Sequence, residues 1–354
     1  MFDHKLTKVC LSVSLGTLFL LLFVFQLDLD AVLENLQDLQ YQFLAPALLF
    51  YFVAFAIRVY RWQLILSPVA SLSIGHLFYS LAVGYMANNL LPVRMGEVIR
   101  AYYLARKTSL STISVLGTLI VERTFDGLIL ACLFMISAVS VSYTVEINFL
   151  GDVQRLSTWL VALVLAIPFV VSFIGIFGSS YSPRVRNKVQ SFIRLISPGF
   201  IGQKLGQVFD ALIVGLRSVL KLRIVLLLLL ASALVWIMEA GVYYWLMKGF
   251  RLENSFDNLV IMLLACVAVT AISNLATALP TSQGGIGPFE FFATLTLLAF
   301  DVEVNLAGTY VMVLHLVLLL PITLIGLLVL WRDSISLFRL NELRRQGSLA
   351  ESLK

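Results

Sequence analysis

Long apolar runs constrain this chain more than any other feature of its sequence. A helix needs about 20 apolar residues to cross a bilayer, and five stretches meet that length: Val9–Leu27, Phe43–Leu66, Leu156–Phe177, Val225–Met247 and Ala307–Leu330. Of the 354 residues, 60% are hydrophobic and 13% are charged, whereas about 25% of the residues in a soluble domain are charged. The sequence therefore predicts an all-α polytopic membrane protein without a separate soluble catalytic domain.

Three other apolar regions are interrupted by polar residues. His76–Pro92 ends in two asparagines and a proline, and Ile113–Tyr143 contains three charged residues. Leu259–Phe300 consists of two apolar arms around the turn Pro280–Pro288. Because irregular backbone is tolerated at membrane depth only where it is buried or lines a cavity, the first and third regions are candidates for re-entrant hairpins.

Basic residues predict the orientation, because Lys and Arg accumulate in cytoplasmic loops. Lys5 and Lys8 precede the first span, and the loop that follows it carries only acidic charges. Residues 179–223 contain eight basic residues, and residues 332–354 contain five. We therefore expect a basic cytoplasmic loop at 179–223, a basic cytoplasmic tail at 332–354, and both termini in the cytoplasm.

These anchors predict about six full spans and two re-entrant helical hairpins in a single integral-membrane domain, residues 1–354, with a membrane core at 9–331. The apolar spacing within Gln203–Leu222 predicts an amphipathic helix in the basic loop. Such a helix lies on the membrane surface or packs on the bundle, and the sequence does not separate these alternatives.

The two hairpin turns share a short motif. Leu91–Glu97 contains Leu-Pro followed by Gly-Glu, and Leu279–Glu290 contains Leu-Pro followed by glycines and a glutamate. Broken helices that enter from opposite faces are typical of transporters built from inverted repeats. Leu-Pro pairs also recur by chance in membrane helices, so both interpretations stay open.

Charged side chains at membrane depth are costly and are therefore candidate site residues. Arg58 and Arg61 lie on one face of a predicted helix, although Arg61 also suits an interfacial position. The densest polar cluster comprises Asn88, Asn89, Arg94, Glu97 and Arg100. Arg94 offers a planar fork that suits phosphate, and Glu97 suits an arginine or an amine. An ordinary cytoplasmic loop with a structural ion pair is the alternative.

Two further groups complete the candidate site. Glu122, Arg123 and Asp126 interrupt an apolar helix, where the two carboxylates share a face and form either a structural network or a substrate contact. Gly284, Gly285 and Gly287 allow close approach of a ligand to the backbone before a helix N-terminus that would attract an anion. The remaining candidates are Glu290, Glu239 and His315, of which the last two are also compatible with buried structural roles.

The chain shows no nucleophile elbow, Walker loop, zinc-ligand spacing or Cys/His pair. We therefore predict no catalytic residue, metal or cofactor, although carboxylates would leave general-base chemistry open.

Four motifs together carry a family resemblance. They are Arg-x-x-Arg-Trp at Arg58–Trp62, Asn-Asn-Leu-Leu-Pro-x-Arg-x-Gly-Glu at Asn88–Glu97, Glu-Arg-x-x-Asp at Glu122–Asp126 and Gly-Gly-Ile-Gly-Pro-x-Glu at Gly284–Glu290. In this order they resemble the flippase-like membrane domain of lysylphosphatidylglycerol synthases and its stand-alone relatives, over roughly Leu11 to Trp331.

The resemblance implies translocation of an aminoacylated or otherwise polar-headed lipid through a cavity between the hairpins. The aminoacyltransferase domain of some relatives is expected to be absent, because the chain ends shortly after Trp331. Relatives often carry an arginine where this chain has His315, which implies a weaker or pH-dependent phosphate contact.

The leading hypothesis is a flippase or scramblase of the bacterial inner membrane that moves a phosphate-headed or polyprenyl-linked lipid. An integral-membrane transferase using Glu122 or Asp126 as base is one rival, and an accessory lipid-binding subunit is another. The expected partners are membrane lipids, together with a second copy of the chain or a separately encoded lipid-modifying enzyme, and no nucleic acid. The sequence does not give the lipid, the direction or the energy source.

Overall fold

The computed structural model describes residues 4–91, 95–140, 144–149, 152–197, 199, 202–203, 206, 209–210, 213, 222–277 and 283–333. Its α-helices are α1 (His4–Val24), α2 (Leu29–Gln37), α3 (Leu44–Leu66), α4 (Ile74–Leu90), α5 (Gly96–Lys107), α6 (Thr112–Ser140), α7 (Thr158–Tyr181), α8 (Pro183–Ile196), α10 (Leu222–Gly249), α11 (Leu259–Ala276), α12 (Pro288–Leu298) and α13 (Val304–Arg332). Short 3-10 helices are η1 (Tyr41–Phe43), η2 (Leu252–Ser255) and η3 (Gln283–Gly285).

Several of these helices are long and apolar enough to cross a membrane. Within the described residues, length and composition identify four: Tyr41–Leu66, Arg223–Gly249, Leu259–Ala276 and Val304–Arg332. A fifth arises if α1 and α2, which meet at 79°, form one broken span. The chain is therefore a polytopic helical membrane protein, as the sequence predicted. Helix α11 is long enough to cross by itself, whereas the sequence analysis treated it as one arm of a re-entrant hairpin.

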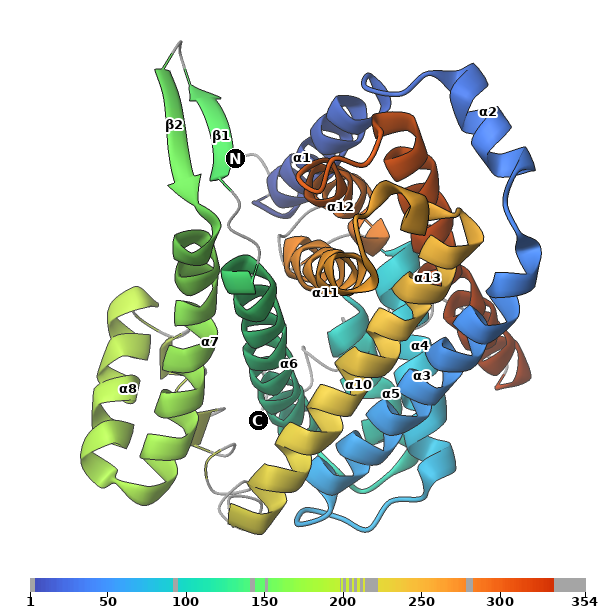
Figure 1. Ribbon diagram of the computed structural model, residues 1–354. Coiled ribbons are helices and arrows are strands. Elements are labelled where there is room, and N and C mark those ends of the chain that lie inside the picture. The colour runs from blue at the N-terminus through green and yellow to red at the C-terminus, as the bar shows by residue number, and fades with distance from the viewer. Residues whose placement is uncertain are drawn as a thin grey trace.

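The bundle contains two halves that pack in the same pattern. Helix α4 packs on α5 and α13, as α11 packs on α12 and α6, and α5 contacts α6 as α12 contacts α13. Helices α3 and α10 pack side by side and antiparallel (Figure 1). The start of α3 lies beside the end of α10, where the Gln40 N–H donates to the Gly249 carbonyl at 3.0 Å. Exchanging α3–α6 with α10–α13 preserves these contacts, which supports the inverted repeat.

Close backbone approach defines the first hairpin. Helix α4 ends at Leu90 and α5 begins at Gly96, whose N–H donates to Asn88 Oδ1 at 2.8 Å. A Cβ atom on Gly96 would lie 2.1 Å from the Gly84 carbonyl oxygen. The hairpin can therefore close only with glycine at position 96, and Asn88 supplies the hydrogen bond that the broken helix lacks.

Positive φ angles shape the second hairpin. Gly284, Gly285 and Gly287 have φ of 63°, 78° and 100°, values that side chains with a Cβ atom rarely adopt. Helix α12 then begins at Pro288, a residue that suits a first helical turn. Both breaks therefore fall in the regions where the sequence predicts turns.

Several elements were not predicted from the sequence, among them two strands and a helix in the basic loop. Strands β1 (Thr144–Phe149) and β2 (Asp152–Ser157) form an antiparallel hairpin between α6 and α7, with a register that begins at Thr144↔Ser157. Helix α8 occupies the first part of the basic loop and folds back on α7 (Figure 1). The predicted amphipathic helix Gln203–Leu222 lies largely outside the described residues.

Aromatic residues fill the centre of the bundle. Trp62, Tyr243 and Tyr310 from α3, α10 and α13 are almost fully buried, and the Tyr310 hydroxyl donates to the Tyr243 carbonyl at 3.1 Å. Many leucines on the outer faces, such as Leu230 and Leu328, are more than half exposed. An apolar exterior around a packed core is the distribution expected when lipid surrounds the bundle.

We expect Gly96→Ala to lower the stability of the purified protein by about 1–3 kcal/mol, because the added methyl group would overlap the α4 backbone. Thermal unfolding in detergent measures this change. Gly75→Ala is the matched control in the same hairpin, since the nearest atom to its added Cβ is 3.9 Å away. Equal unfolding midpoints for the two variants would contradict the packing described for this hairpin.

Candidate functional site

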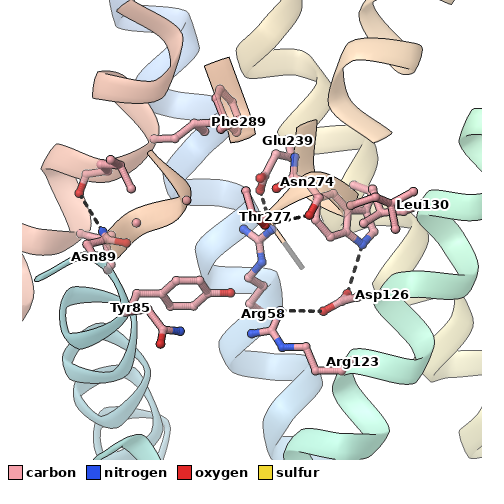
Figure 2. A pocket seen from close by; sticks show the side chains of 18 of the residues that line it. Arg58, Tyr85, Asn89, Arg123, Asp126, Leu130, Glu239, Asn274, Thr277 and Phe289 are labelled. Atoms are coloured by element: carbon pink, nitrogen blue, oxygen red, sulfur yellow. Dashed lines mark hydrogen bonds and ion pairs between the residues drawn. The ribbon is translucent and has the colours of Figure 1, made fainter. Parts of the chain in front are cut away.

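A cavity of about 420 Å³ lies where the two hairpins meet α3, α6, α10 and α13. Figure 2 shows Arg58, Asp126 and Arg123 on one side of it, with Asn89 and Phe289 toward the other. Its polar lining also includes Asn88, Glu97, Glu239 and Asn274, and its apolar lining includes Phe55, Leu130, Phe169, Leu318 and Ile322. The cavity is therefore amphipathic, with a volume typical of small-molecule sites.

An ion pair between α3 and α10 forms the inner wall. Arg58 Nη2 lies 2.5 Å from Glu239 Oε2, and both side chains are less than one-tenth exposed. The guanidinium also faces the rings of Trp236 and Tyr85, at 5.4 and 6.0 Å from their centroids. Glu239 offsets part of the cost of burying the Arg58 charge, and removal of either partner would leave an uncompensated charge in the interior.

A second network lies behind this wall. Arg61 is fully buried, and both of its terminal nitrogens donate to the Asp126 carboxylate. The Nη2–Oδ2 distance is 3.0 Å. Arg61 also donates to Ser232 at 2.8 Å, and Trp236 Nε1 donates to Asp126 Oδ1 at 3.1 Å. Asp126 reaches the cavity, but its oxygens are already occupied by donors from α3 and α10.

The network continues to α5 through Glu122. Arg100 binds both oxygens of Glu122, at 3.1 and 2.9 Å, and its guanidinium lies 3.6 Å from the centroid of a Trp62 ring. Trp62 Nε1 in turn donates to Thr118 Oγ1 at 3.1 Å. These side chains are nearly fully buried, so this part of the network joins α3, α5 and α6 without contacting the cavity.

Arg123 and Glu97 form a more exposed pair at the cavity. Arg123 Nε lies 3.3 Å from Glu97 Oε1, and the two side chains are 43% and 31% exposed. Arg123 Nη1 also lies 4.0 Å from Asp126 Oδ2. Both side chains of this pair can therefore make further contacts, unlike Arg58 and Glu239.

His315 and Glu290 form a buried pair at the second hairpin. His315 Nδ1 lies 2.5 Å from Glu290 Oε1, and its Nε2 lies 3.1 Å from the Gly284 carbonyl oxygen. The imidazole stacks on Phe289 with a centroid distance of 4.0 Å. Glu290 Oε2 accepts from the Gly287 N–H at 2.7 Å, so the anion expected at this helix N-terminus is the helix's own glutamate.

A family model described as the lysylphosphatidylglycerol synthase TM region matches residues 9–326. The chain belongs to this family.

Curated relatives of this family member come from archaea. It is 24% identical to the glycosyltransferase AglD of Haloferax volcanii over 327 residues, which is 88% of this chain and 52% of the relative. The chain therefore spans about half the length of AglD. It is 24% identical to a UPF0104 membrane protein of Pyrococcus horikoshii, covering 91% of this chain and 97% of that protein. A UPF0104 membrane protein of Methanothermobacter thermautotrophicus is 23% identical, with 88% and 90% covered.

The structure separates the predicted site residues of this family member into groups. Those that line the cavity are Arg58, Asn88, Asn89, Glu97, Arg123, Asp126, Glu239, Gly284, Gly285 and His315. Arg61, Arg100 and Glu122 instead belong to the buried network. Gly287 and Glu290 hold the turn behind His315, and Arg94 lies outside the described residues.

Among the polar and aromatic cavity residues that sequence reasoning missed are Tyr85, Trp236 and Asn274. Asn274 is an amide within the apolar helix α11 and could have been found as a polar group at membrane depth. Trp236 precedes Glu239 by three residues, which places both on one helical face. Tyr85 carries no such signal, because a single tyrosine in an apolar helix is common.

The described residues place no three His, Cys, Asp or Glu side chains where they could share a metal ion. What this part of the chain offers instead is ion pairs, amides and backbone polar groups around an amphipathic space.

We expect Arg61→Met to destabilise the protein by about 3–5 kcal/mol, because it would leave Asp126 without its guanidinium partner in the interior. Arg106→Met removes an exposed arginine of α5 and serves as the control. Thermal unfolding in detergent compares the two variants. A wild-type midpoint for Arg61→Met would show that the network contributes nothing to folding.

Proposed function

We propose that this protein moves a phosphate-headed lipid between the leaflets of a membrane, as a flippase or scramblase. The observation that carries the proposal is the partly exposed pair Arg123 and Glu97 at an amphipathic cavity in a polytopic membrane protein. The family match supports a role connected with membrane lipids. Lipids are accordingly the proposed partners.

The charges at the cavity favour a headgroup that carries both signs. Arg58 and Glu239 compensate each other, and Asp126 is bound by Arg61 behind the wall. Arg123 remains accessible for a phosphate, since a guanidinium binds phosphate oxygens through two parallel hydrogen bonds. Glu97, 3.3 Å away, is accessible for an amine. An aminoacylated or other zwitterionic phospholipid meets both requirements.

The apolar part of the lining suits the remainder of a lipid. Leu318 and Ile322 of α13, Phe169 of α7 and Leu130 of α6 face the same cavity as the charges. A headgroup held by Arg123 would leave its glycerol and first methylene groups against these side chains, where apolar burial is favourable. The cavity can hold a headgroup region, and the acyl chains would extend into the surrounding bilayer.

The proposed setting is the inner membrane of a bacterium, with both termini in the cytoplasm. The distribution of basic residues supports this orientation. In that frame the ends of α3 and α5 near Arg61 and Lys107 face the cytoplasm, and α2 and the β-hairpin face outward. The hairpins would then open the cavity to one side or the other by rocking of the two inverted halves.

A transferase acting on a lipid carrier is the second candidate, because one relative is named as a glycosyltransferase. That name belongs to a protein of which this chain spans about half. A general base must also be free to accept a proton, and Glu122 and Asp126 are both bound by arginine. The transferase therefore remains the weaker proposal.

Arg123→Gln should slow lipid translocation by about tenfold or more, because the variant loses a charge-assisted contact worth about 1.5–3 kcal/mol. The measurement is transbilayer movement of fluorescent anionic, zwitterionic and aminoacylated phospholipids in proteoliposomes. Glu97→Gln should reduce movement of the amine-bearing lipids more than that of the anionic lipids.

Lys248→Gln is the matched control, because Lys248 forms a partly exposed 2.8 Å pair with Glu253 away from the cavity. Full translocation by Arg123→Gln would remove this arginine from the site. No movement of any lipid by folded wild-type protein would refute the transport proposal. Formation of a covalent product from a polyprenyl phosphate and a nucleotide sugar, detected by mass spectrometry, would favour the transferase.

A further inference from the structure

Each hairpin places a glutamate from the first turn of its second helix against a basic side chain of the helix that follows. Glu97 is the second residue of α5 and Glu290 the third residue of α12. Their partners, Arg123 and His315, are each the twelfth residue of the helix that follows, counted from 112 to 123 and from 304 to 315. Because α5–α6 and α12–α13 correspond in the inverted halves, these are two versions of one contact.

The two contacts differ in closure and in chemistry. Arg123 and Glu97 are 3.3 Å apart and 43% and 31% exposed. His315 and Glu290 are 2.5 Å apart, and their side chains are less than one-tenth exposed. The first contact is therefore loose and carries a permanent cation, whereas the second is tight and carries an imidazole, which can gain or lose a proton.

The two hydrogen bonds of the His315 ring form together only if the ring or its partner Glu290 holds an additional proton. The Gly284 carbonyl can only accept, so Nε2 at 3.1 Å must carry hydrogen to bond it. An ionised Glu290 also only accepts, and one of its oxygens already receives the Gly287 N–H. Each neutral tautomer of the imidazole therefore leaves two acceptors face to face, at Glu290 or at Gly284. Both contacts form only when the His315–Glu290 pair holds one proton more than neutral imidazole and carboxylate.

We propose that His315 and Glu290 form a proton-binding site, in which one bound proton closes the second hairpin on α13 and its loss loosens the turn at Gly284–Gly287. The turn depends on this contact, since His315 and Glu290 together bind its first and last residues. No bond other than those to hydrogen changes: the proton leaves to water that enters the cavity. If the transport proposal holds, this site couples lipid movement to proton binding.

Other charged and titratable groups lie on the helices around the pair. Helix α11 contributes Cys266 alone, and α1 from Val13 to Val24 contributes none. The groups from other elements that line the same cavity are Tyr51 and Arg58 of α3, Tyr85 of α4, Glu97 of α5, Arg123 and Asp126 of α6 and Glu239 of α10, and α2 contributes the exposed Asp30 and Glu34. Arg58 pairs with Glu239, Asp126 with Arg61, and Arg123 with Glu97. His315 and Glu290 are the side chains that hydrogen-bond the turn at Gly284 and Gly287, so a proton bound by this pair acts on the turn directly.

A cysteine at Leu319 reports the state of the turn without any need for transport. The Leu319 side chain lies beside Gly284, where a Cβ would be 3.4 Å from its Cδ1 atom, and it lines the cavity. The test uses Leu319→Cys in protein whose native Cys10, Cys132 and Cys266 are replaced. Maleimide labelling in nanodiscs at pH 5.5 and 8.5 is divided by the rate for the unfolded variant at the same pH.

We expect the normalised labelling rate to rise by about tenfold from the lower to the higher pH, which corresponds to a shift of about 1.4 kcal/mol between closed and open turn. His315→Arg should abolish the rise by converting this contact into the permanent type of Arg123 and Glu97. Glu290→Gln should abolish it as well and covers the case in which the arginine does not fit. His76→Gln is the control, because His76 is exposed at the start of α4 and its loss should leave the rise unchanged.

Labelling that does not depend on pH, or a pH dependence that persists in both His315→Arg and Glu290→Gln, would overturn the proton site. The same variants in proteoliposomes test the coupling separately. A pH-dependent turn without lipid movement would leave the proton site standing and refute transport. Lipid movement with a pH-independent turn would leave transport standing and refute the proton site.

Discussion

The need to compensate every charge in an apolar interior underlies the arrangement of this bundle. An unpaired ion among packed apolar helices is strongly destabilising, whereas a paired and hydrogen-bonded one is tolerated. Arg58 with Glu239, Arg61 with Asp126, and Arg100 with Glu122 meet this requirement by joining different helices. The ion pairs therefore fix which helices are neighbours, in a solvent where apolar contact alone discriminates poorly among partners.

The paired charges are of two kinds: buried ones that join helices, and more exposed ones that are available to a ligand. The network of Arg61, Arg100 and Glu122 is nearly sealed from solvent, and its arginines make further contacts with the Trp62 ring and Ser232. Arg123 and Glu97 satisfy each other but keep much of their surface at the cavity. The same residue types thus serve two purposes, and the exposed fraction of each side chain distinguishes them.

The inverted halves of the bundle carry one contact with different chemistry on the two sides. An arginine on α6 and a histidine on α13 stand at the same place in their helices. The proposed proton site therefore belongs to one half only, because an arginine stays charged whereas an imidazole can gain or lose a proton. The two ends of the cavity therefore share a backbone arrangement but differ in the basic side chain that contacts the glutamate.

Sequence alone determined the membrane setting, the helical class and the positions of both broken helices. Apolar run length and the position of prolines and glycines are local properties, and they act before any long-range contact forms. It also identified the charged residues that line the cavity, because polar groups are rare in apolar helices. It did not predict β1, β2 or α8, whose pairing depends on neighbours rather than on apolar runs.

Tertiary structure decided how those charges combine. Four arginines and five carboxylates allow many pairings in a linear sequence, and only the packing of α3, α5, α6 and α10 selects Arg61 for Asp126 and Arg123 for Glu97. The roles of Trp236 and Asn274 likewise emerge only from the fold. The physical reason is that burial and distance, which set the energy of an ion pair, are properties of several helices together.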